Sequence, residues 1–173
     1  DADEAGYVGK TNVENFVAAA AASLLNGLTT DELLSATKNL KGVVRRFDVH
    51  VSTDNVVYID DYAHHPAELK ACIQSIREMY AGKKLTGVFQ PHLYTRTRDF
   101  ATEFAESLSL LDELILLDIY PARELPIPGV TSKIIFDKVT CKEKTLCSKT
   151  ELLDVLRNKE IEVLITLGAG DID

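Results

Sequence analysis

The chain has 173 residues, of which 46% are apolar, enough for the core of one domain of ordinary size with a small attached subdomain. Its 27 acidic and 19 basic residues give a net charge of -8, which argues against a broad nucleic-acid-binding face but allows a local basic pocket for a phosphorylated small molecule. No apolar run approaches the roughly 18 residues of a membrane span, and the first residues lack the order of a signal peptide. We therefore expect a cytoplasmic protein with no membrane or nucleic-acid partner.

The three cysteines, Cys72, Cys141 and Cys147, have no paired metal-ligand spacing, and an odd number does not suit a disulfide framework. They are predicted to be reduced thiols.

Two helices are predicted before the first strand. The alanine-rich segment 12–25 has helical periodicity, and Thr29 or Thr30 can cap a second helix over 31–40. The apolar residues expected to face inward are Phe16, Val17, Ala20 and Leu24 in the first helix and Leu33, Leu34 and Ala36 in the second. Gly42 ends this helical part, and we place a domain boundary there. The chain enters its first helix with no preceding strands, as expected of a piece of a longer protein.

From residue 43 the pattern becomes that of an α/β domain. Segments 44–51 and 56–60 read as a β-hairpin around a Thr-Asp-Asn turn. The later predicted elements are a helix at 67–80, a strand at 85–89, a helix at 97–110, a strand at 113–118, a proline-rich loop at 120–129, helices at 132–138 and 149–158, and a strand at 161–167. This alternation predicts a mainly parallel, Rossmann-like sheet with helices on both faces.

Two loops concentrate the chemically useful side chains. Each follows an apolar strand, and their sequences are Asp60-Asp61-Tyr62-Ala63-His64-His65-Pro66 and Gln90-Pro91-His92-Leu93-Tyr94-Thr95-Arg96-Thr97-Arg98-Asp99. In an open α/β sheet, ligands bind where strands end and loops begin. Histidines, acids and arginines together suit an anionic substrate with a second reactant beside it, so we expect the functional site there.

Five strings in this order resemble the C-terminal half of Mur ligases, the bacterial family that adds amino acids to peptidoglycan precursors, and its L-alanine-adding branch in particular. They are GKTNVENFVAAAA, DDYAHHP, FQPHLYTRTRDF, YPARELPIPGVTS and LGAGDI. The resemblance runs from about Gly9 to the end and is specific because several long motifs agree in order and spacing. It implies that residues 1–42 are the tail of a central ATP-binding domain and that residues 43–173 are the Mur ligase C-terminal domain.

The resemblance also implies a reaction. Family members use ATP and Mg²⁺ to convert the carboxylate of UDP-N-acetylmuramate to an acyl phosphate, which the amine of L-alanine attacks. The sequence contains no Gly-x-x-x-x-Gly-Lys-[Ser/Thr] phosphate-binding loop. We therefore expect this part to bind and position the amino acid and to close over ATP, to need the N-terminal and central domains of the same parent chain, and to be inactive alone.

The same resemblance implies which residues lie on the ATP side of the site. Asn12 and Asn15 are expected to contact the adenine, since an amide both donates and accepts, although an asparagine at this place can equally be a helix cap. A histidine usual in the family is replaced by Thr11. One of Arg45 and Arg46, by preference Arg46, is expected to reach ATP when the C-terminal domain closes. The alternative is that one arginine is simply exposed and the other forms a surface ion pair. Asp61 is expected to face the ribose or the hinge.

Substrate-side residues come from the two loops. Tyr62, His64 and His92 are expected to line the amino-acid site, with His64 orienting or deprotonating the attacking ammonium and His65 supporting the loop. Arg96 has the planar fork to bind the alanine carboxylate by two hydrogen bonds.

Other residues near these loops have weaker assignments. Thr97 is a candidate cap for the following helix, and Arg98 with Asp99 reads as a surface pair. Leu93 stands where many members have arginine, which removes one cationic contact. Arg123 and Gly168-Ala169-Gly170-Asp171 read as loop positions without a role in chemistry.

Three alternatives stay open. Adjacent histidines could bind a metal, but they lack the usual i, i+4 spacing and no third ligand is evident, so no metal ligands are assigned. The related ligase that recycles murein peptides is similar in outline, although the run from His92 to Arg98 favours the alanine enzyme. A freestanding, non-catalytic α/β binding module would also lack a phosphate-binding loop.

Overall fold

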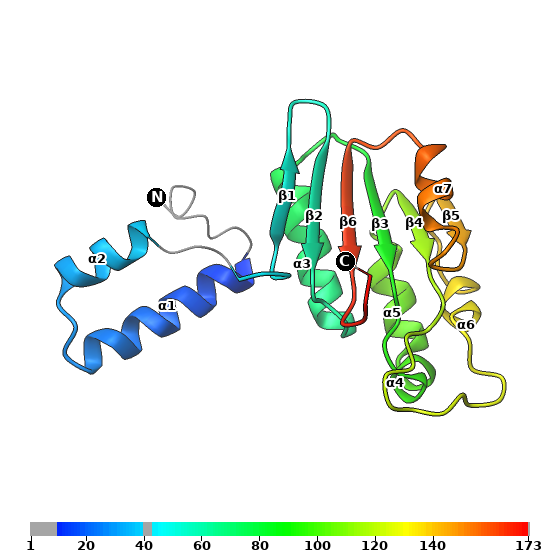
Figure 1. The fold of residues 1–173 in the computed structure, drawn as a ribbon, viewed down its shortest axis with the longest axis horizontal. Helices are drawn as coiled ribbons and strands as arrows, with labels where there is room; N and C mark the ends of the chain where they lie inside the picture. Colours follow the sequence, from blue (N-terminus) through cyan, green and yellow to red (C-terminus); the bar gives the residue numbers. More distant parts are fainter. Residues whose placement is uncertain (1–9, 40–42, 173) are drawn as a thin grey trace.

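The structure, a computed structural model, describes residues 10–39 and 43–172 (Figure 1). Its helices are α1 (Lys10–Leu25), α2 (Thr30–Lys38), α3 (Pro66–Met79), α4 (Tyr94–Asp99), α5 (Ala101–Leu108), α6 (Lys133–Phe136) and α7 (Leu152–Arg157). Its strands are β1 (Asp48–Ser52), β2 (Val57–Asp61), β3 (Leu85–Phe89), β4 (Glu113–Leu116), β5 (Glu143–Leu146) and β6 (Val163–Leu167). Gly9 and Gly42, which mark the start of the motif match and the predicted domain boundary, lie outside the described residues.

The six strands form one sheet in the order β1-β2-β6-β3-β4-β5. β1 is antiparallel to β2, and the other pairs are parallel. The last strand, β6, therefore lies between β2 and β3, with Leu167 in register with Asp61 on one side and Phe89 on the other. The carboxyl ends of these three strands are level, so the loops that follow them share one edge of the sheet.

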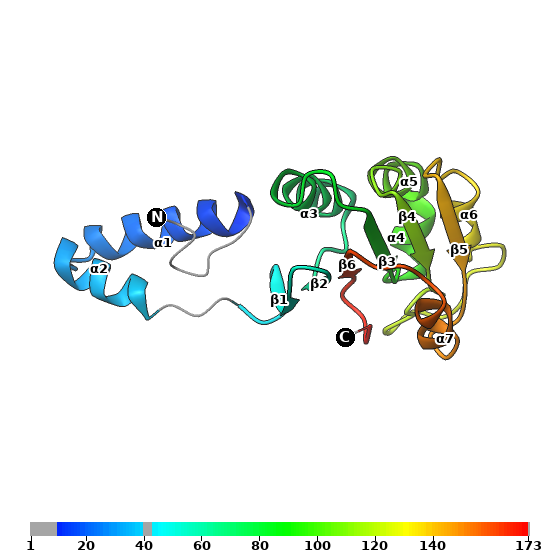
Figure 2. The ribbon, with the colours of Figure 1, turned by 90° about the horizontal axis from the view of Figure 1, so that it is seen from above.

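Helices cover both faces of the sheet, as predicted (Figure 2). α3, α5 and α6 pack on one face over a core that includes Phe89 and Phe104. α7 lies on the other face, where Val88, Ile115 and Leu152 belong to a smaller core. Neighbouring residues of β3 thus serve opposite faces, and all five are buried. Burial on both faces is why this strand reads as a nearly continuous apolar run.

The two N-terminal helices are confirmed as helices, but their predicted inward faces only in part, since Phe16, Ala20 and Leu33 are half-buried. Thr29 caps α2 as predicted: its Oγ1 accepts from Glu32 N, while Glu32 Oε2 accepts from Thr29 N at 2.9 Å. Val17, Leu24 and Leu34, expected to be inward, are exposed by 59%, 44% and 57%. The described residues therefore leave apolar surface of this helical hairpin uncovered.

The segment before β1 departs from the predicted strand. Strand structure begins at Asp48 rather than residue 44, because Arg45 and Phe47 have φ values of 61° and 54°. A β-strand requires negative φ at every residue, so neither residue can lie in one. Arg45 and Arg46, which fall within the predicted strand 44–51, therefore lie outside β1.

The predicted helix over 97–110 is two helices with a break at Phe100. The first begins at Tyr94, after Leu93 turns the chain with φ 73°. Thr97 is therefore inside α4 and is not a cap. Its side chain is fully buried, and its Oγ1 donates to the Leu93 carbonyl at 2.8 Å.

The sequence prediction missed β5. This strand, Glu-Lys-Thr-Leu, pairs in parallel with β4 at the end of the sheet and has no fully buried residue. A short polar strand has neither the apolar run of a buried strand nor clear alternation, so periodicity does not distinguish it from a loop.

A buried ionic cluster closes the amino-terminal edge of the sheet. Glu113 opens β4, and its fully buried carboxylate contacts Lys84 Nζ at 2.8 Å and also Lys159 Nζ. Burial acts to raise the pKa of Glu113, but the hydrogen bonds from Lys159 and Lys84 outweigh it and hold the pKa below 4.5. The cluster connects the strand to the segments that precede β3 and β6.

We expect Glu113→Gln to lower the free energy of unfolding by about 3 kcal/mol, because it leaves two lysines beside a neutral amide. Glu143→Gln is the matched control: this exposed glutamate also contacts Lys84, at 3.3 Å, and its loss should cost less than about 1 kcal/mol. The difference in free energy of unfolding between the wild type and Glu113→Gln should shrink as the pH falls below 4.5. A carboxyl group whose pKa is lowered by folding stabilises the folded chain only while it is ionised. Urea unfolding measures both; equal losses for the two variants would contradict this account.

Candidate functional site

Four aromatic rings form a row along the carboxyl edge of the sheet. Tyr62 and His64 follow β2, His92 follows β3, and Tyr120 follows β4. The ring centroids are 5.2 Å apart for Tyr62 and His64, 6.1 Å for His64 and His92, and 5.7 Å for His92 and Tyr120, the last pair stacked. The structure therefore brings together the three residues predicted to line the amino-acid site, and it adds Tyr120.

His64 is held in one tautomer by its own loop. Its Nδ1 lies 2.9 Å from the Tyr62 carbonyl oxygen and 3.3 Å from Glu68 Oε2. Because a carbonyl only accepts, Nδ1 must carry a hydrogen, and in the neutral ring Nε2 is then the acceptor. The backbone N–H of His64 also donates to Glu68 Oε2, at 3.0 Å. The ring is thus oriented with its basic nitrogen away from the loop.

His92 is half-buried, and its environment favours the neutral ring. Burial lowers its pKa from 6.5, and the charge of Arg96 and the neighbouring His64 lower it further. Its Nδ1 is buried and has no hydrogen-bond partner among the described residues. A buried polar atom without a partner costs free energy, so it marks a place where a ligand or water can bind.

Arg96 has a second such atom. It lies on α4, and its Nη1 is buried without a hydrogen-bond partner in the described chain. The first turn of α4 is fixed because Thr95 N and Oγ1 donate to Glu124 at 3.0 and 2.5 Å. A guanidinium on this helix, with a buried N–H available, can bind a carboxylate through charge-assisted hydrogen bonds.

Gln90 is a residue that the sequence analysis did not select. It directly follows β3, is only 5% exposed, and donates from Nε2 to Asp171 Oδ1 at 3.1 Å. Its Oε1 is the third buried polar atom without a partner in the described residues. An amide directly after a fully buried strand is the signal that could have identified it. With His92 and Arg96, it places all three such atoms within seven consecutive residues.

The predicted nucleotide-side residues meet at the start of the sheet domain. Asn12 Nδ2 donates to the Arg46 carbonyl at 3.2 Å, which connects α1 to the segment before β1. The Arg46 guanidinium lies 5.2 Å from the centre of the Tyr62 ring, and Asn15 is exposed one helical turn after Asn12. Asn12, Asn15 and Arg46 are therefore grouped around the amino-terminal part of α1.

Asp61 faces inward. Its carboxylate accepts from the backbone N–H groups of Phe47 and Ala63, each at 2.8 Å. Burial raises its pKa, although these two hydrogen bonds act in the opposite direction. One oxygen thus binds the segment that joins the helices to the sheet, and the other binds the loop after β2.

Arg45 is more deeply engaged than the sequence suggested. Its Nε contacts the fully buried Asp60 at 3.1 Å, and its Cζ lies 5.3 Å from the centre of the Tyr62 ring. Both arginines of the pair thus approach the same aromatic ring. Their similar placement follows from the irregular backbone at this point rather than from strand alternation.

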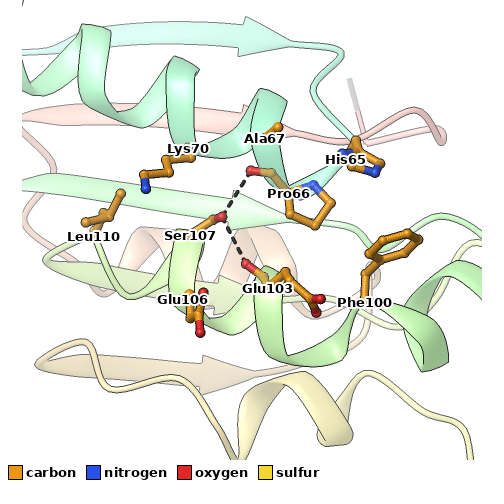
Figure 3. A pocket seen from close by; sticks show the side chains of 9 residues that line it. All are labelled: His65, Pro66, Ala67, Lys70, Phe100, Glu103, Glu106, Ser107 and Leu110. Atoms are coloured by element: carbon orange, nitrogen blue, oxygen red, sulfur yellow. Dashed lines mark hydrogen bonds between the residues drawn. The ribbon is translucent and has the colours of Figure 1, made fainter.

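His65 faces a separate cavity of about 360 Å³ between α3 and α5 (Figure 3). Its ring packs edge-on against Phe100, with centroids 5.1 Å apart. Ser107, in the same wall, donates to the carbonyls of Pro66 and Glu103 at 3.0 and 2.9 Å. His65 also precedes Pro66, the first residue of α3, as predicted. It therefore supports the loop and the helix start rather than the aromatic row.

The other sequence expectations concern metals, thiols and membranes. Among residues 10–39 and 43–172, no group of three or more His, Cys, Asp or Glu side chains is placed to hold a metal ion. Cys72, Cys141 and Cys147 are free, and burial raises the pKa of each thiol. No helix in the described part of the chain is both long and apolar enough to cross a bilayer.

Comparison with known proteins identifies similar chains. The model of the family "Mur ligase, glutamate ligase domain" matches residues 45–170. UDP-N-acetylmuramate--L-alanine ligases from Parabacteroides distasonis and Phocaeicola vulgatus are 63% and 61% identical over 170 and 163 residues, or 98% and 94% of this chain. The matches cover 37% and 36% of those proteins, so the chain spans just over a third of the length of these curated relatives.

Solved structures agree with this comparison. The UDP-N-acetylmuramate-alanine ligase of Thermotoga maritima is 31% identical, with a TM-score of 0.77, over 95% of this chain and 35% of that one. A murein peptide ligase from Psychrobacter arcticus has a TM-score of 0.63 over 94% of this chain and 34% of its own, but only 17% identity, which shows a shared fold alone.

We expect the His92 ring to titrate below 6.5 and Arg96→Met to raise its pKa, because the Arg96 charge opposes protonation. Arg98→Met is the control: Arg98 is exposed and pairs with Asp99 at 2.7 Å, so its loss should leave the His92 pKa unchanged. A pKa below that of the unfolded chain also means that the contribution of His92 to stability falls as the pH drops through 6.5. NMR titration of the ring protons measures the pKa. A His92 pKa at or above 6.5 would refute the claim that its surroundings favour the neutral ring.

Proposed function

Because the chain belongs to the Mur ligase family, we propose that it is the C-terminal part of an ATP-dependent UDP-N-acetylmuramate:L-alanine ligase that acts in cytoplasmic peptidoglycan precursor synthesis. The observation that carries the proposal is the convergence of Tyr62, His64 and His92 with Arg96, whose buried N–H has no partner in the described residues, in a chain 63% identical to a ligase of that name.

The guanidinium of Arg96 binds the carboxylate of L-alanine. Arg96 lies on a helix whose first turn is held by Glu124, so the helix is in place before the substrate arrives. This preorganisation reduces the ordering cost of binding. His92, kept neutral by burial, does not add a positive charge that would repel the ammonium of the same amino acid.

His64 receives the ammonium proton. Its Nδ1 hydrogen is used by the Tyr62 carbonyl, which leaves Nε2 as the acceptor in the neutral ring. An amine must lose a proton to become a nucleophile, and the unprotonated nitrogen of a neutral imidazole can accept it. The Tyr62 ring, 5.2 Å from His64, and His92 form the walls on either side.

Asn12, Asn15 and Arg46 form the nucleotide side. ATP with Mg²⁺ activates the carboxylate of UDP-N-acetylmuramate for attack by the amine. The exposed amide of Asn15 suits the adenine edge, and Arg46 lies on the segment next to the helices, so its charge can approach the phosphates on domain closure. Asp61 holds this segment through Phe47, and we assign it to the hinge, with a ribose contact in the closed state.

The rest of the site belongs to the parts of the ligase outside this chain. The N-terminal and central domains of the same polypeptide supply the UDP-sugar site and the phosphate-binding loop, so this chain alone should be inactive. The peptide-recycling ligase is less favoured, since the solved murein peptide ligase is 17% identical and the alanine ligase 31%.

The test is phosphate release by the full-length protein with ATP, UDP-N-acetylmuramate and L-alanine. We expect Arg96→Ala to raise the KM for L-alanine by roughly 10- to 100-fold, the value of one or two lost charged hydrogen bonds. Arg98→Ala, on the same helix but exposed beside Asp99, should stay within about twofold of wild type.

Turnover that requires the peptide L-alanyl-γ-D-glutamyl-diaminopimelate in place of alanine would assign the recycling reaction. No turnover with either acceptor, in a folded full-length protein, would instead support a binding module.

A further inference from the structure

The segment 43–47, which joins the helices to the sheet, is held in a strained conformation. Arg45 and Phe47 are non-glycine residues with φ values of 61° and 54°, and such residues persist only where surrounding contacts compensate for the strain. Here the Arg45 carbonyl accepts from Tyr62 N at 2.7 Å, and Phe47 N donates to Asp61 at 2.8 Å. The segment is thus attached to the loop that carries Tyr62 and His64.

The side chain of Arg45 extends the attachment to a second loop. Nη1 donates to the Gly170 carbonyl at 2.9 Å, and Nη2 donates to the Gly168 carbonyl at 2.7 Å. Nε donates to the fully buried Asp60 at 3.1 Å, so the guanidinium has a fixed direction. One side chain therefore bridges segment 43–47, strand β2 and the loop after β6.

The loop after β6 contacts the wall of the proposed amino-acid site. A Cβ on Gly170 would lie 2.2 Å from Gln90 Oε1 and 2.9 Å from Tyr120 Cγ. Tyr120 in turn stacks on His92 at 5.7 Å. There is no free space on this side of Gly170, so a displacement of the loop toward Gln90 or Tyr120 must move them.

We propose that Arg45 is a positioning residue that couples segment 43–47 to the amino-acid site through Gly168, Gly170 and Tyr120. Movement of the segment that joins the helical part to the sheet is transmitted to His92, so amino-acid binding depends on the arrangement of that segment. The inference rests on the proposed ligase function for its kinetic consequence, but its structural part is independent of that function.

Two variants break the coupling at different points. Arg45→Lys keeps the charge beside Asp60 but cannot make both bonds to Gly168 and Gly170. Gly170→Ala leaves Arg45 in place and displaces Gln90 and Tyr120. In the full-length ligase, each should raise the KM for L-alanine roughly tenfold, because small misplacements of positioning groups have effects of this size or larger. The KM for ATP should stay within about twofold.

Arg77→Lys is the matched control. Arg77 also joins a backbone carbonyl, that of Leu110 at 2.6 Å, and a carboxylate, that of Asp112 at 3.0 Å, but it belongs to the opposite edge of the sheet. It should cost stability without changing the KM for L-alanine. Thermal unfolding of all three variants shows which retain the fold.

A second readout needs no catalysis. In the 173-residue chain, Arg45→Lys and Gly170→Ala should shift the His92 ring-proton resonance, assigned by its loss in His92→Gln, while Arg77→Lys should not. The proposal is overturned if Arg45→Lys leaves both this resonance and the KM for L-alanine unchanged, or if Arg77→Lys alters them equally. If the wild-type full-length protein shows no alanine-dependent turnover, the ligase function fails, and the resonance alone decides the role of Arg45.

Discussion

The position of β6 between β2 and β3 is the constraint on which the rest of the site depends. Because the three strands are parallel and level, the loops after Asp61, Phe89 and Leu167 must share one edge. The loop after β6 follows the other two by more than 70 positions in the sequence, yet it lies at the centre of the edge, where it contacts Gln90 and Tyr120 and accepts hydrogen bonds from Arg45. A site built from segments more than 100 residues apart is thus held together by the pairing of one central strand.

Buried charges stabilise the two edges of the sheet for different purposes. At the amino-terminal edge, the carboxylate of Glu113 is paired with Lys84 and Lys159. At the carboxyl edge, Asp60 is paired with Arg45 and accepts from Thr166, while Gln90, His92 and Arg96 each retain a buried atom without a partner in the described residues. The first edge therefore pairs its buried charge within the described residues. The second leaves polar groups unsatisfied, as expected where a ligand completes the hydrogen bonding.

Much of the fold, and part of the site, could be predicted from the sequence. Apolar runs and their alternation with helices predicted the parallel sheet. The rule that ligands bind at strand ends predicted that Tyr62, His64 and His92 lie together. What failed depends on tertiary contacts: the positive φ of Arg45 and Phe47 has no local signal, because the bonds that stabilise it come from Asp61, Tyr62 and Gly170. Gln90 was not selected because the carboxylate to which it donates, that of Asp171, lies 81 positions later in the chain. The exposed faces of α1 and α2 show that periodicity predicts which face is apolar, not whether anything covers it.

The central claim is that the carboxyl edge of this sheet binds the amino acid of an alanine ligase. Its most direct test is a crystal structure of the full-length protein with the product UDP-N-acetylmuramoyl-L-alanine and a non-hydrolysable ATP analogue. The account predicts that the alanine carboxylate lies within hydrogen-bonding distance of the Arg96 guanidinium, with His64 and His92 around the alanine and Arg46 directed toward the phosphates. An alanine carboxylate bound by residues outside this edge, with Arg96 unoccupied, would contradict it.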